Sequence, residues 1–354
     1  MKLRIAQLGP LWENIPPPKY GGTERIVHYL TEGLVKKGHE VTLFACGTCQ
    51  TSAKLFSVYP RPLFRDGIPW WNVMYPLLNM TAVFERAADY DIIHVHLNQG
   101  SDFFSLPLFQ PIKHKVVFTL HFPYEFNYTW KGNTEVLQKY KDMKFISISD
   151  SQRKGGENLN WVKTIYNGVD TRLYTFNPNP KDYFLWLGKF NPDKGTQDAV
   201  LAAKKAGVKM IIAGAVDKLE GEDYQYYLAT KKYIDGKQIQ LIGEITDQEK
   251  NELYGNAIGF LNPIRWNEPF GLVMAESMAT GTPVISFKNG AAPEIIEDGK
   301  SGFLVDNIDA MAEKIKEINR IDRSYCRQTI EKYFSVDKMV EGYEEVYKQL
   351  TANH

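Results

Sequence analysis

The sequence contains little cysteine and no long apolar run. Three cysteines in 354 residues are too few for a disulfide framework, so we expect a reduced, cytoplasmic compartment. No apolar stretch approaches the roughly 20 residues that a membrane-spanning helix requires. Residues 1–9 have the pattern of a buried strand and lack that of a signal peptide. We therefore expect a cytoplasmic protein with no membrane-spanning segment.

The chain also lacks an excess of charge of either sign. Lys and Arg number 42, and Asp and Glu number 42, so no overall positive field attracts nucleic acid. Residues 1–169 carry 19 basic and 14 acidic side chains. This small excess would suit an anionic acceptor or peripheral contact with the inner face of a membrane. Scattered, solvated charge explains the same excess.

The first half of the chain alternates short apolar strands with helical stretches. A strand at 3–9 precedes a helix that Thr23 can cap, and the next strand lies at 41–45, which completes a βαβ unit. Further apolar strands are expected at 92–95, 116–119, 145–148 and 164–166. Continuous apolar strands of this kind are typical of a parallel sheet that is covered on both faces.

The pattern restarts after a proline-rich segment at 177–180, which we interpret as a linker. Helices are expected at 196–206 and about 336–350, and strands at 183–187, 208–213, 240–242, 259–262, 283–286 and 303–305. The length of the chain suits two domains of ordinary size. The sequence therefore predicts two Rossmann-like, doubly wound α/β domains, over 1–170 and 178–335.

Residues 267–285 carry the strongest signal for chemistry. Pro269 fits the first turn of a helix that runs to about residue 280. The amides of Gly271, Leu272 and Val273 would then project from the start of the helix without intrahelical partners. Such amides, together with the helix dipole, form a binding site for an anion such as phosphate.

Two carboxylates accompany this predicted anion site. Glu268 precedes the amides, and Glu276 follows about two turns later on the same side of a regular helix. Carboxylates accept hydrogen bonds from sugar hydroxyls, and amides bind phosphate. The combination favours a nucleotide sugar as the ligand. Two exposed glutamates on a helix would be the simpler interpretation of the same pair.

The same stretch resembles the E-x7-E motif of retaining family 4 glycosyltransferases, which have the GT-B fold. The resemblance extends over nearly the whole chain through six further segments, at 20–24, 38–43, 90–96, 117–121, 167–170 and 187–195. It implies two Rossmann-like domains with a cleft between them that closes over the donor, the linker acting as a hinge. It also implies that the C-terminal helix, 336–354, packs back on the N-terminal domain.

The resemblance assigns roles to the charged residues of the second half. Glu268 would bind hydroxyls of the donor sugar, and Glu276 would bind the nucleotide ribose. Lys189 and Lys194 would neutralise the donor diphosphate and stabilise the leaving nucleotide. Relatives often have arginine where Lys189 stands, and lysine keeps the charge but loses the two-pronged geometry.

The remaining donor contacts that the resemblance implies are mostly backbone groups. The glycine-rich loop would let the chain approach the phosphates closely, because glycine has no side chain. The nucleotide base would be lined by backbone near two further glycines. These predicted contacts are Gly21, Gly22, Gly214, Gly243, Phe270, Gly271 and Leu272. His121 matches the active-site histidine, which faces the donor sugar, and we assign it no general-base role.

Aromatic residues alternate along 122–130. If this segment is extended, its aromatic side chains share one face, which would suit the faces of sugar rings. Tyr124, Tyr128 and Trp130 are therefore candidates for an acceptor platform, together with Trp12, Trp70 and Trp71. Aromatic packing within the domain is the alternative.

Three pairs have metal-ligand spacing and lack support. His94 and His96 share one face of a strand but have no visible third ligand, so strand packing explains them. Asp89 and Asp91 precede their strand, whereas ligands gather at the carboxyl ends. The pair Cys46 and Cys49 stands alone, which is weak support for zinc or redox chemistry. We expect no metal site.

The sequence therefore predicts a retaining, metal-independent transfer of a hexosyl group from a nucleotide sugar to a hydroxyl acceptor. The donor would be of the UDP-glucose or GDP-mannose type, and the acceptor a carbohydrate, a lipid-linked molecule or a small molecule. An epimerase, a phosphorylase and an inert sugar-binding protein stay open as alternatives. An NAD-dependent oxidoreductase is disfavoured because the first strand is not followed by G-x-G-x-x-G.

Overall fold

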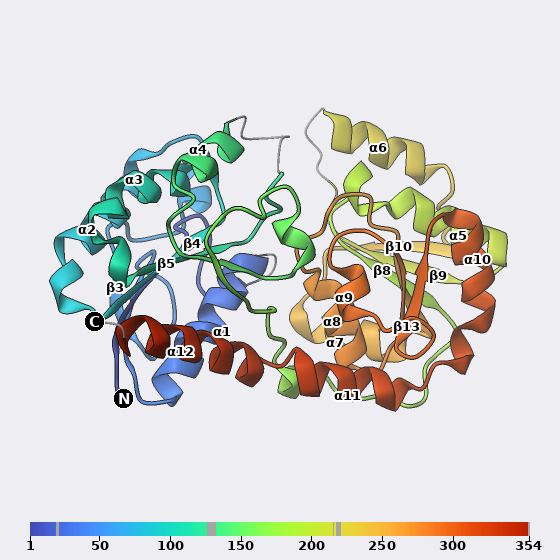
Figure 1. Cartoon of the computed structure of the whole chain (residues 1–354). Helices are drawn as coiled ribbons and strands as arrows, with labels where there is room; N and C mark the ends of the chain where they lie inside the picture. The colour runs from blue at the N-terminus through green and yellow to red at the C-terminus, as the bar shows by residue number, and fades with distance from the viewer. Residues whose placement is uncertain (19–20, 126–131, 215, 217–220, 353–354) are drawn as a thin grey trace. The chain divides into compact units, whose positions relative to one another are not determined.

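The computed structural model describes residues 1–18, 21–125, 132–214, 216 and 221–352. The chain divides into two α/β units (Figure 1), of residues 1–168 with 336–354 and of residues 169–335. The boundary lies ahead of the predicted linker at 177–180. Asn177 belongs to the second unit, because its amide donates to Thr280 O at 3.0 Å and its carbonyl accepts from Arg323 Nε at 2.7 Å.

The first unit contains a seven-stranded parallel sheet. Its strands, in the spatial order β3-β2-β1-β4-β5-β6-β7, are β1 (Arg4–Leu8), β2 (Glu40–Phe44), β3 (Lys54–Phe56), β4 (Ile92–Leu97), β5 (Val116–Leu120), β6 (Phe145–Ser147) and β7 (Trp161–Thr164). Two strands differ from the prediction. The edge strand β3 is short and only half-buried, so its apolar signal is weak, and β7 lies earlier than the expected strand at 164–166.

Helices α1 (Gly22–Lys36), α2 (Met74–Glu85), α3 (Ser105–Phe109), α4 (Asn133–Lys139) and α12 (Val336–Ala352) accompany this sheet. The C-terminal helix α12 packs against α1, as expected (Figure 1). A glycine permits this contact, because a Cβ added at Gly33 would lie 2.4 Å from Val340 Cγ2. Helix α12 therefore contributes to the first unit although the second unit precedes it in the chain.

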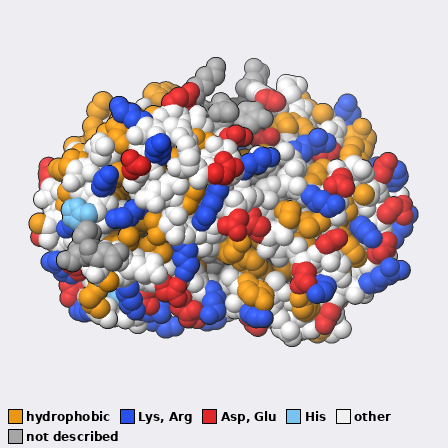
Figure 2. Space-filling view, in the orientation of Figure 1, with side chains coloured by type: hydrophobic (Ala, Val, Ile, Leu, Met, Phe, Trp, Pro, Cys, Tyr) orange, Lys and Arg blue, Asp and Glu red, His pale blue; other side chains and the backbone are white. Residues whose placement is uncertain are grey.

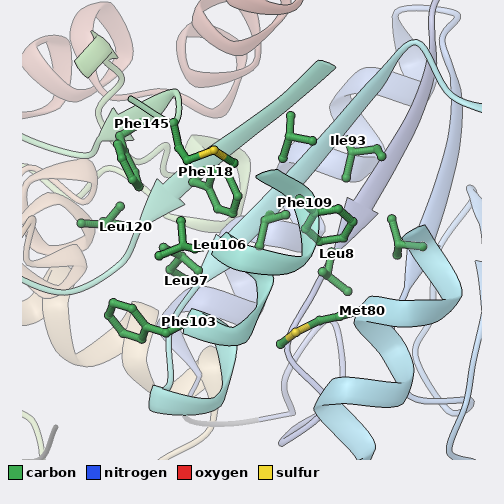
Figure 3. Close-up of a cluster of buried hydrophobic side chains, with 14 of the residues drawn as sticks. Leu8, Met80, Ile93, Leu97, Phe103, Leu106, Phe109, Phe118, Leu120 and Phe145 are labelled. Carbon is green, nitrogen blue, oxygen red and sulfur yellow. The ribbon is translucent and has the colours of Figure 1, made fainter. Parts of the chain in front are cut away.

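The core of the first unit lies between the sheet and helices α2 and α3 (Figure 3). Phe118 and Phe145 project from neighbouring strands, and their ring centroids are 5.8 Å apart. Phe109 from α3 and Met80 from α2 cover the same face of the sheet. Burial of these side chains stabilises the folded state by roughly 25 cal/mol per Å² of apolar surface. The packed core holds in place the strands that carry the polar residues described below.

The second unit contains a six-stranded parallel sheet in the order β10-β9-β8-β11-β12-β13. The strands are β8 (Phe184–Leu187), β9 (Met210–Ala213), β10 (Ile239–Gly243), β11 (Gly259–Asn262), β12 (Val284–Phe287) and β13 (Gly302–Val305). The helices are α5 (Thr196–Ala206), α6 (Glu222–Lys231), α7 (Asp247–Asn256), α8 (Leu272–Ala279), α9 (Ala292–Ile295), α10 (Ile308–Glu317) and α11 (Arg323–Tyr333). The predicted α/β class and doubly wound topology are confirmed in both units.

Both sheets reverse their strand order beside the first strand of the unit. The reversal lies between β1 and β4 in the first sheet and between β8 and β11 in the second. Loops that leave the carboxyl ends of such strands diverge and form a crevice, where ligands of open α/β sheets bind. Each unit therefore has one expected place for a ligand. Within the described part of the chain, no helix is both long and apolar enough to cross a membrane.

Candidate active site

Helix α8 follows β11 beside the reversal of the second sheet, and it begins later than predicted. Its first residue is Leu272, and Pro269 lies outside it. Gly271 is the reason, because its φ of 87° is left-handed and cannot continue a right-handed helix. The Met274 amide donates to Gly271 O at 3.0 Å, so the amides of Leu272 and Val273 are the ones left without intrahelical partners at the positive end of the helix dipole.

A lysine and a glutamate are paired just ahead of this helix. Lys194 Nζ lies 2.5 Å from Glu268 Oε2, and Trp266 Nε1 donates to the same oxygen at 3.0 Å. The ammonium also lies 4.9 Å from the centre of the Trp266 ring. Lys194 comes from the loop after β8 and Glu268 from the loop after β11. The reversal of the sheet thus brings together two residues that are 74 positions apart.

The second predicted lysine has a different partner. Lys189, which follows β8, places its Nζ 2.8 Å from Asp223 Oδ2 in the first turn of α6. The Lys189 side chain is 43% exposed and that of Lys194 is 29% exposed, so both ammonium groups are accessible from solvent. Asp223 was not predicted from the sequence.

Glu276 is buried within the second unit. Its Oε1 accepts from Lys250 Nζ at 3.0 Å, and its Oε2 lies 3.5 Å from the Tyr254 hydroxyl. Lys250 also lies 3.3 Å from Asp247, at the start of α7. Burial, followed by the negative charge of Glu276, raises the pKa of Tyr254 well above its ordinary value. The two motif glutamates therefore have separate lysine partners.

Three glycines meet where β8, β9 and β10 end. The Gly214 amide donates to Gly243 O at 2.8 Å, and a Cβ added at Gly214 would lie 1.8 Å from Gly188 O. Only glycine fits at Gly214 without displacing the backbone. Backbone groups of these three glycines therefore lie in close contact at this end of the sheet.

Phe270 lies directly before Gly271, in the loop that leads to α8. Its side chain is buried, and its ring centroid lies 5.9 Å from that of Phe334. The ring therefore anchors the loop before α8 and presents no exposed face to a ligand. In the first unit, Gly21 caps α1 and Gly22 is its first residue.

His121 immediately follows β5, and its amide donates to Leu97 O at 3.0 Å. The imidazole Nε2 lies 2.9 Å from His96 Nδ1, and the two rings stack with centroids 5.2 Å apart. Burial lowers the pKa of His121 to about 3, so the ring is neutral near pH 7.

The acceptor platform is corrected where the structure describes it. Tyr124 is 4% exposed, accepts from Gln138 Nε2 at 2.6 Å and belongs to the hydrophobic core. Trp12 is buried as well, whereas Trp70 and Trp71 are exposed. The other two candidates, Tyr128 and Trp130, lie outside the described residues. The alternation of aromatic residues in the sequence is the same whether the shared face is exposed or packed into the core, so it could not distinguish the two cases.

The residues of the three pairs with metal-ligand spacing contact neighbouring groups in the structure. His94 and His96 are buried side by side on β4, with ring centroids 4.1 Å apart. Asp91 immediately precedes β4, at the amino end of that strand, and accepts from the Arg4 amide at 2.8 Å. Cys46 and Cys49 are buried, with their Sγ atoms 3.1 Å apart.

Comparison with known families decides the identity. The model "Glycosyltransferase Family 4" matches residues 20–173, and the model "Glycosyl transferases group 1" matches residues 175–333. Together the two models span most of both units. The chain belongs to the family 4 glycosyltransferases. Its phosphatidyl-myo-inositol mannosyltransferase relative from Mycolicibacterium smegmatis is 25% identical over 88% of this chain and 83% of the relative.

Solved structures show that this family 4 glycosyltransferase has the GT-B fold. Sucrose-phosphate synthase from Thermosynechococcus elongatus superimposes with a TM-score of 0.78 at 18% identity, over the whole of both chains. The Anabaena protein HepE, solved in complex with UDP-glucose, gives a TM-score of 0.72 at 20% identity over 98% of this chain and 100% of that one.

Three residues of this glycosyltransferase were missed from the sequence, namely Lys250, Asp223 and Gly290. A Cβ added at Gly290 would lie 2.4 Å from Glu268 N, so this glycine lets the chain pass close to the motif glutamate. Lys250 lies 26 positions from its partner Glu276, on a different helix, and nothing in the local pattern indicates the pair.

On the face shown in Figure 2, basic and acidic side chains are interspersed.

Proposed function

We propose that the chain is a retaining glycosyltransferase that moves a hexosyl group from a nucleotide sugar to a hydroxyl acceptor. The observation that carries the proposal is the Lys194–Glu268 pair just ahead of α8. A cation and unpartnered amides suit a diphosphate, and a carboxylate suits sugar hydroxyls. HepE was solved with UDP-glucose, and the mycobacterial relative is a mannosyltransferase, which supports donors of the UDP-glucose and GDP-mannose types.

Different residues of the second unit bind different parts of the donor. Lys194 and Lys189 neutralise the diphosphate and stabilise the leaving nucleotide. Glu268 accepts from hydroxyls of the sugar, and Glu276 accepts from the ribose, with Lys250 holding its carboxylate in place. The amides of Gly271 and Leu272 add donors that need no reorganisation when charge develops on the phosphate.

The reaction proceeds with retention and without a divalent cation. The leaving phosphate accepts the proton of the attacking hydroxyl on the same face of the sugar, so the protein supplies positioning and charge stabilisation. Lysine side chains and helix amides serve the phosphate where another enzyme would use a metal ion. NMR of the product distinguishes retention from inversion at the anomeric carbon.

The acceptor is a carbohydrate, a lipid-linked molecule or a small molecule, and a lipid-linked acceptor would be met at the cytoplasmic face of a membrane. Large apolar side chains along one segment of the first unit support this location, because exposed Trp, Leu and Met insert into membrane interfaces. They are Phe64, Trp70, Trp71, Met74, Leu77 and Leu78. Flotation with anionic lipid vesicles tests the contact, and the double variant Trp70→Ser/Trp71→Ser should reduce it.

The decisive experiment is a thermal-shift and calorimetric screen of UDP, GDP, ADP and their sugars, with and without chelator. A ligand that binds only the native state raises its stability. We expect one diphosphate to stabilise the protein selectively, with the effect retained in chelator and lost in Lys194→Ala. The absence of any shift in the folded protein would contradict the proposal and favour an inert binding protein. Product analysis then excludes an epimerase or a phosphorylase, since a phosphorylase needs inorganic phosphate.

A further inference from the structure

His121 is the first member of a chain of buried hydrogen bonds in the first unit. Its Nε2 lies 2.9 Å from His96 Nδ1, and His96 Nε2 lies 2.9 Å from Gln7 Oε1. Gln7 lies on β1, His96 on β4 and His121 just after β5. The contacts therefore join the carboxyl-terminal halves of three neighbouring strands. The Gln7 and His96 side chains are almost completely buried.

The hydrogen-bond chain continues from Gln7 to the C-terminal helix. Gln7 Nε2 donates to the Tyr347 hydroxyl at 3.1 Å, and that hydroxyl lies 2.6 Å from His94 Nδ1. His94 Nε2 lies 2.7 Å from Thr119 Oγ1, which lies 3.1 Å from the Tyr343 hydroxyl. These polar atoms are shielded from water, so their protons must be distributed among one another.

The Gln7 amide sets the direction of donation toward His121. Because its Nε2 donates to Tyr347, its Oε1 faces His96 and can only accept. His96 therefore carries its proton on Nε2. Burial lowers the pKa of His96 well below its ordinary value, so the ring is neutral and its Nδ1 has no proton. His96 Nδ1 must then accept from His121 Nε2.

The same reasoning fixes the proton of His121. A neutral imidazole carries one ring proton, and here it lies on Nε2, between His121 and His96. The other nitrogen, Nδ1, has no hydrogen-bond partner within the described part of the chain and is not among its buried unpaired atoms. As a whole residue, His121 is half-buried.

We propose that Gln7 and His96 are positioning residues that hold His121 as the Nε2–H tautomer, so that Nδ1 accepts a hydrogen bond from a hydroxyl of the bound sugar. The proposal rests on the proposed function, because the nucleotide sugar supplies that hydroxyl. The opposite tautomer would carry its proton on Nδ1. That nitrogen would then donate a hydrogen bond and could not accept one from the hydroxyl. Gln7 lies 114 positions before His121 in the chain and acts on it only through His96.

The test is to observe the imidazole nitrogens directly in the full-length protein labelled with ¹⁵N. Long-range ¹H–¹⁵N correlation spectra distinguish protonated from unprotonated ring nitrogens. We expect His121 to be protonated on Nε2 and bare on Nδ1 in the wild type. Observation of Nδ1–H as the main form overturns the proposal, and this result does not depend on any variant being folded.

Variants then separate positioning from folding. Gln7→Leu removes the acceptor that fixes His96, so we expect a mixture of His121 tautomers and a fall in kcat of about tenfold, the effect of one lost hydrogen bond. Tyr343→Phe is the matched control at the far end of the hydrogen-bond chain, and it should leave both the tautomer and kcat unchanged. A single, unchanged tautomer in folded Gln7→Leu overturns the role of Gln7.

Addition of the nucleotide sugar tests the ligand. Binding should shift the Nδ1 resonance of His121 in the direction of a hydrogen-bonded acceptor. A nucleotide sugar that binds by calorimetry but leaves Nδ1 unchanged overturns the contact. A protein that binds no nucleotide sugar overturns the proposed function instead, and the tautomer spectra of the free protein still decide the roles of Gln7 and His96.

Discussion

The candidate site residues of the two units differ in charge. In the first unit, the residues around His121 are neutral and are joined by directional hydrogen bonds. Burial also raises the pKa of two carboxyl groups of this unit, that of Glu24 to about 7 and that of Asp102 to about 6. In the second unit, by contrast, ammonium and carboxylate groups are paired at Lys194–Glu268 and Lys250–Glu276.

This difference fits a division of labour between the units. Paired charges are costly to bury, and replacing them by apolar residues is often harmless, so we attribute their presence to the ligand rather than to stability. In the proposed function a diphosphate brings charge, and the second unit supplies the lysines Lys194 and Lys189 for it. For the sugar hydroxyls, the proposed contact of His121 adds a neutral acceptor from the first unit to the carboxylate of Glu268 from the second. The predictions below break or sharpen this contrast.

The largest expected effect comes from removing a charge of the second unit. Lys194→Ala should lower kcat/KM for sugar transfer by about 10²–10³-fold, because it removes a donor from the departing phosphate. The variant also leaves the Glu268 carboxylate unpaired beside the phosphate site. Steady-state kinetics with the donor identified by the binding screen provide the measurement.

Lys205→Ala is the matched control for this prediction. Its Nζ pairs with Asp309 at 2.7 Å, in the same unit and largely exposed to solvent. The control should retain full activity. A loss of less than threefold in Lys194→Ala would contradict the assignment of Lys194 to the phosphate.

The second prediction concerns the buried carboxyl of Glu24 in the first unit. The pKa of Glu24 is raised from its ordinary value of 4.5 to about 7, chiefly by burial. Between pH 4.5 and 7 the folded state keeps a proton that the unfolded state has released. The free energy of unfolding should therefore fall as pH rises through this window, by about 3 kcal/mol in total.

Glu24→Gln removes this titration and isolates its contribution. Urea unfolding of both proteins at several pH values between 4.5 and 8 provides the measurement. The contributions of the other titrating groups cancel in the difference between the two unfolding free energies. The variant should become the more stable protein as pH rises. Parallel stability curves would show that Glu24 is ionised in the folded state.

Local signals predicted the elements, whereas the partners of the site residues depend on the fold. Helix α5 matches its predicted bounds, since left-handed glycines, Gly195 and Gly207, flank it and residues between them keep helical spacing. The start of α8 was wrong because Pro269 is compatible with a first turn, while the positive φ of Gly271 is invisible in sequence. Propensity describes what a residue tolerates, and the tertiary context selects among these options.

The motif residues were predictable because they resemble a family, and their partners were not. Gln7 and His96 are 89 positions apart, and Gln7 and Tyr347 are 340 apart. No periodicity links such residues, since their contacts arise only when β1 and β4 pair and α12 returns to the first unit. Tyr124 shows the opposite error, because its alternating pattern looked like a platform and its side chain lies in the core.

The third prediction tests the ribose contact of the second unit. Glu276→Gln should weaken nucleotide diphosphate binding by about tenfold, or 1.4 kcal/mol, because a neutral amide replaces the charged carboxylate that accepts from the ribose. The fold should tolerate the change, since Lys250 keeps Asp247 at 3.3 Å. The variant should also lose most of its preference for the ribonucleotide over its 2′-deoxy analogue.

Calorimetry with both nucleotides provides the measurement of the ribose contact. Glu297→Gln is the control, because Glu297 lies in the same unit and pairs with Lys300 on the surface. It should bind both nucleotides as the wild type does. Equal loss of affinity for the two nucleotides in Glu276→Gln would place the glutamate away from the ribose hydroxyls.

The smallest expected effect lies at the end of the buried hydrogen-bond chain of the first unit. Tyr343→Phe removes a hydroxyl that lies 3.1 Å from Thr119 Oγ1, and both side chains are fully buried. The loss should be about 1 kcal/mol of unfolding free energy, since Thr119 keeps its contact with His94. Tyr227→Phe, at a half-buried tyrosine of the second unit whose hydroxyl bonds to no group in the described part of the chain, should cost less. Urea unfolding measures both variants, and equal costs would mean that the terminal hydrogen bond adds nothing to the neutral interior of the first unit.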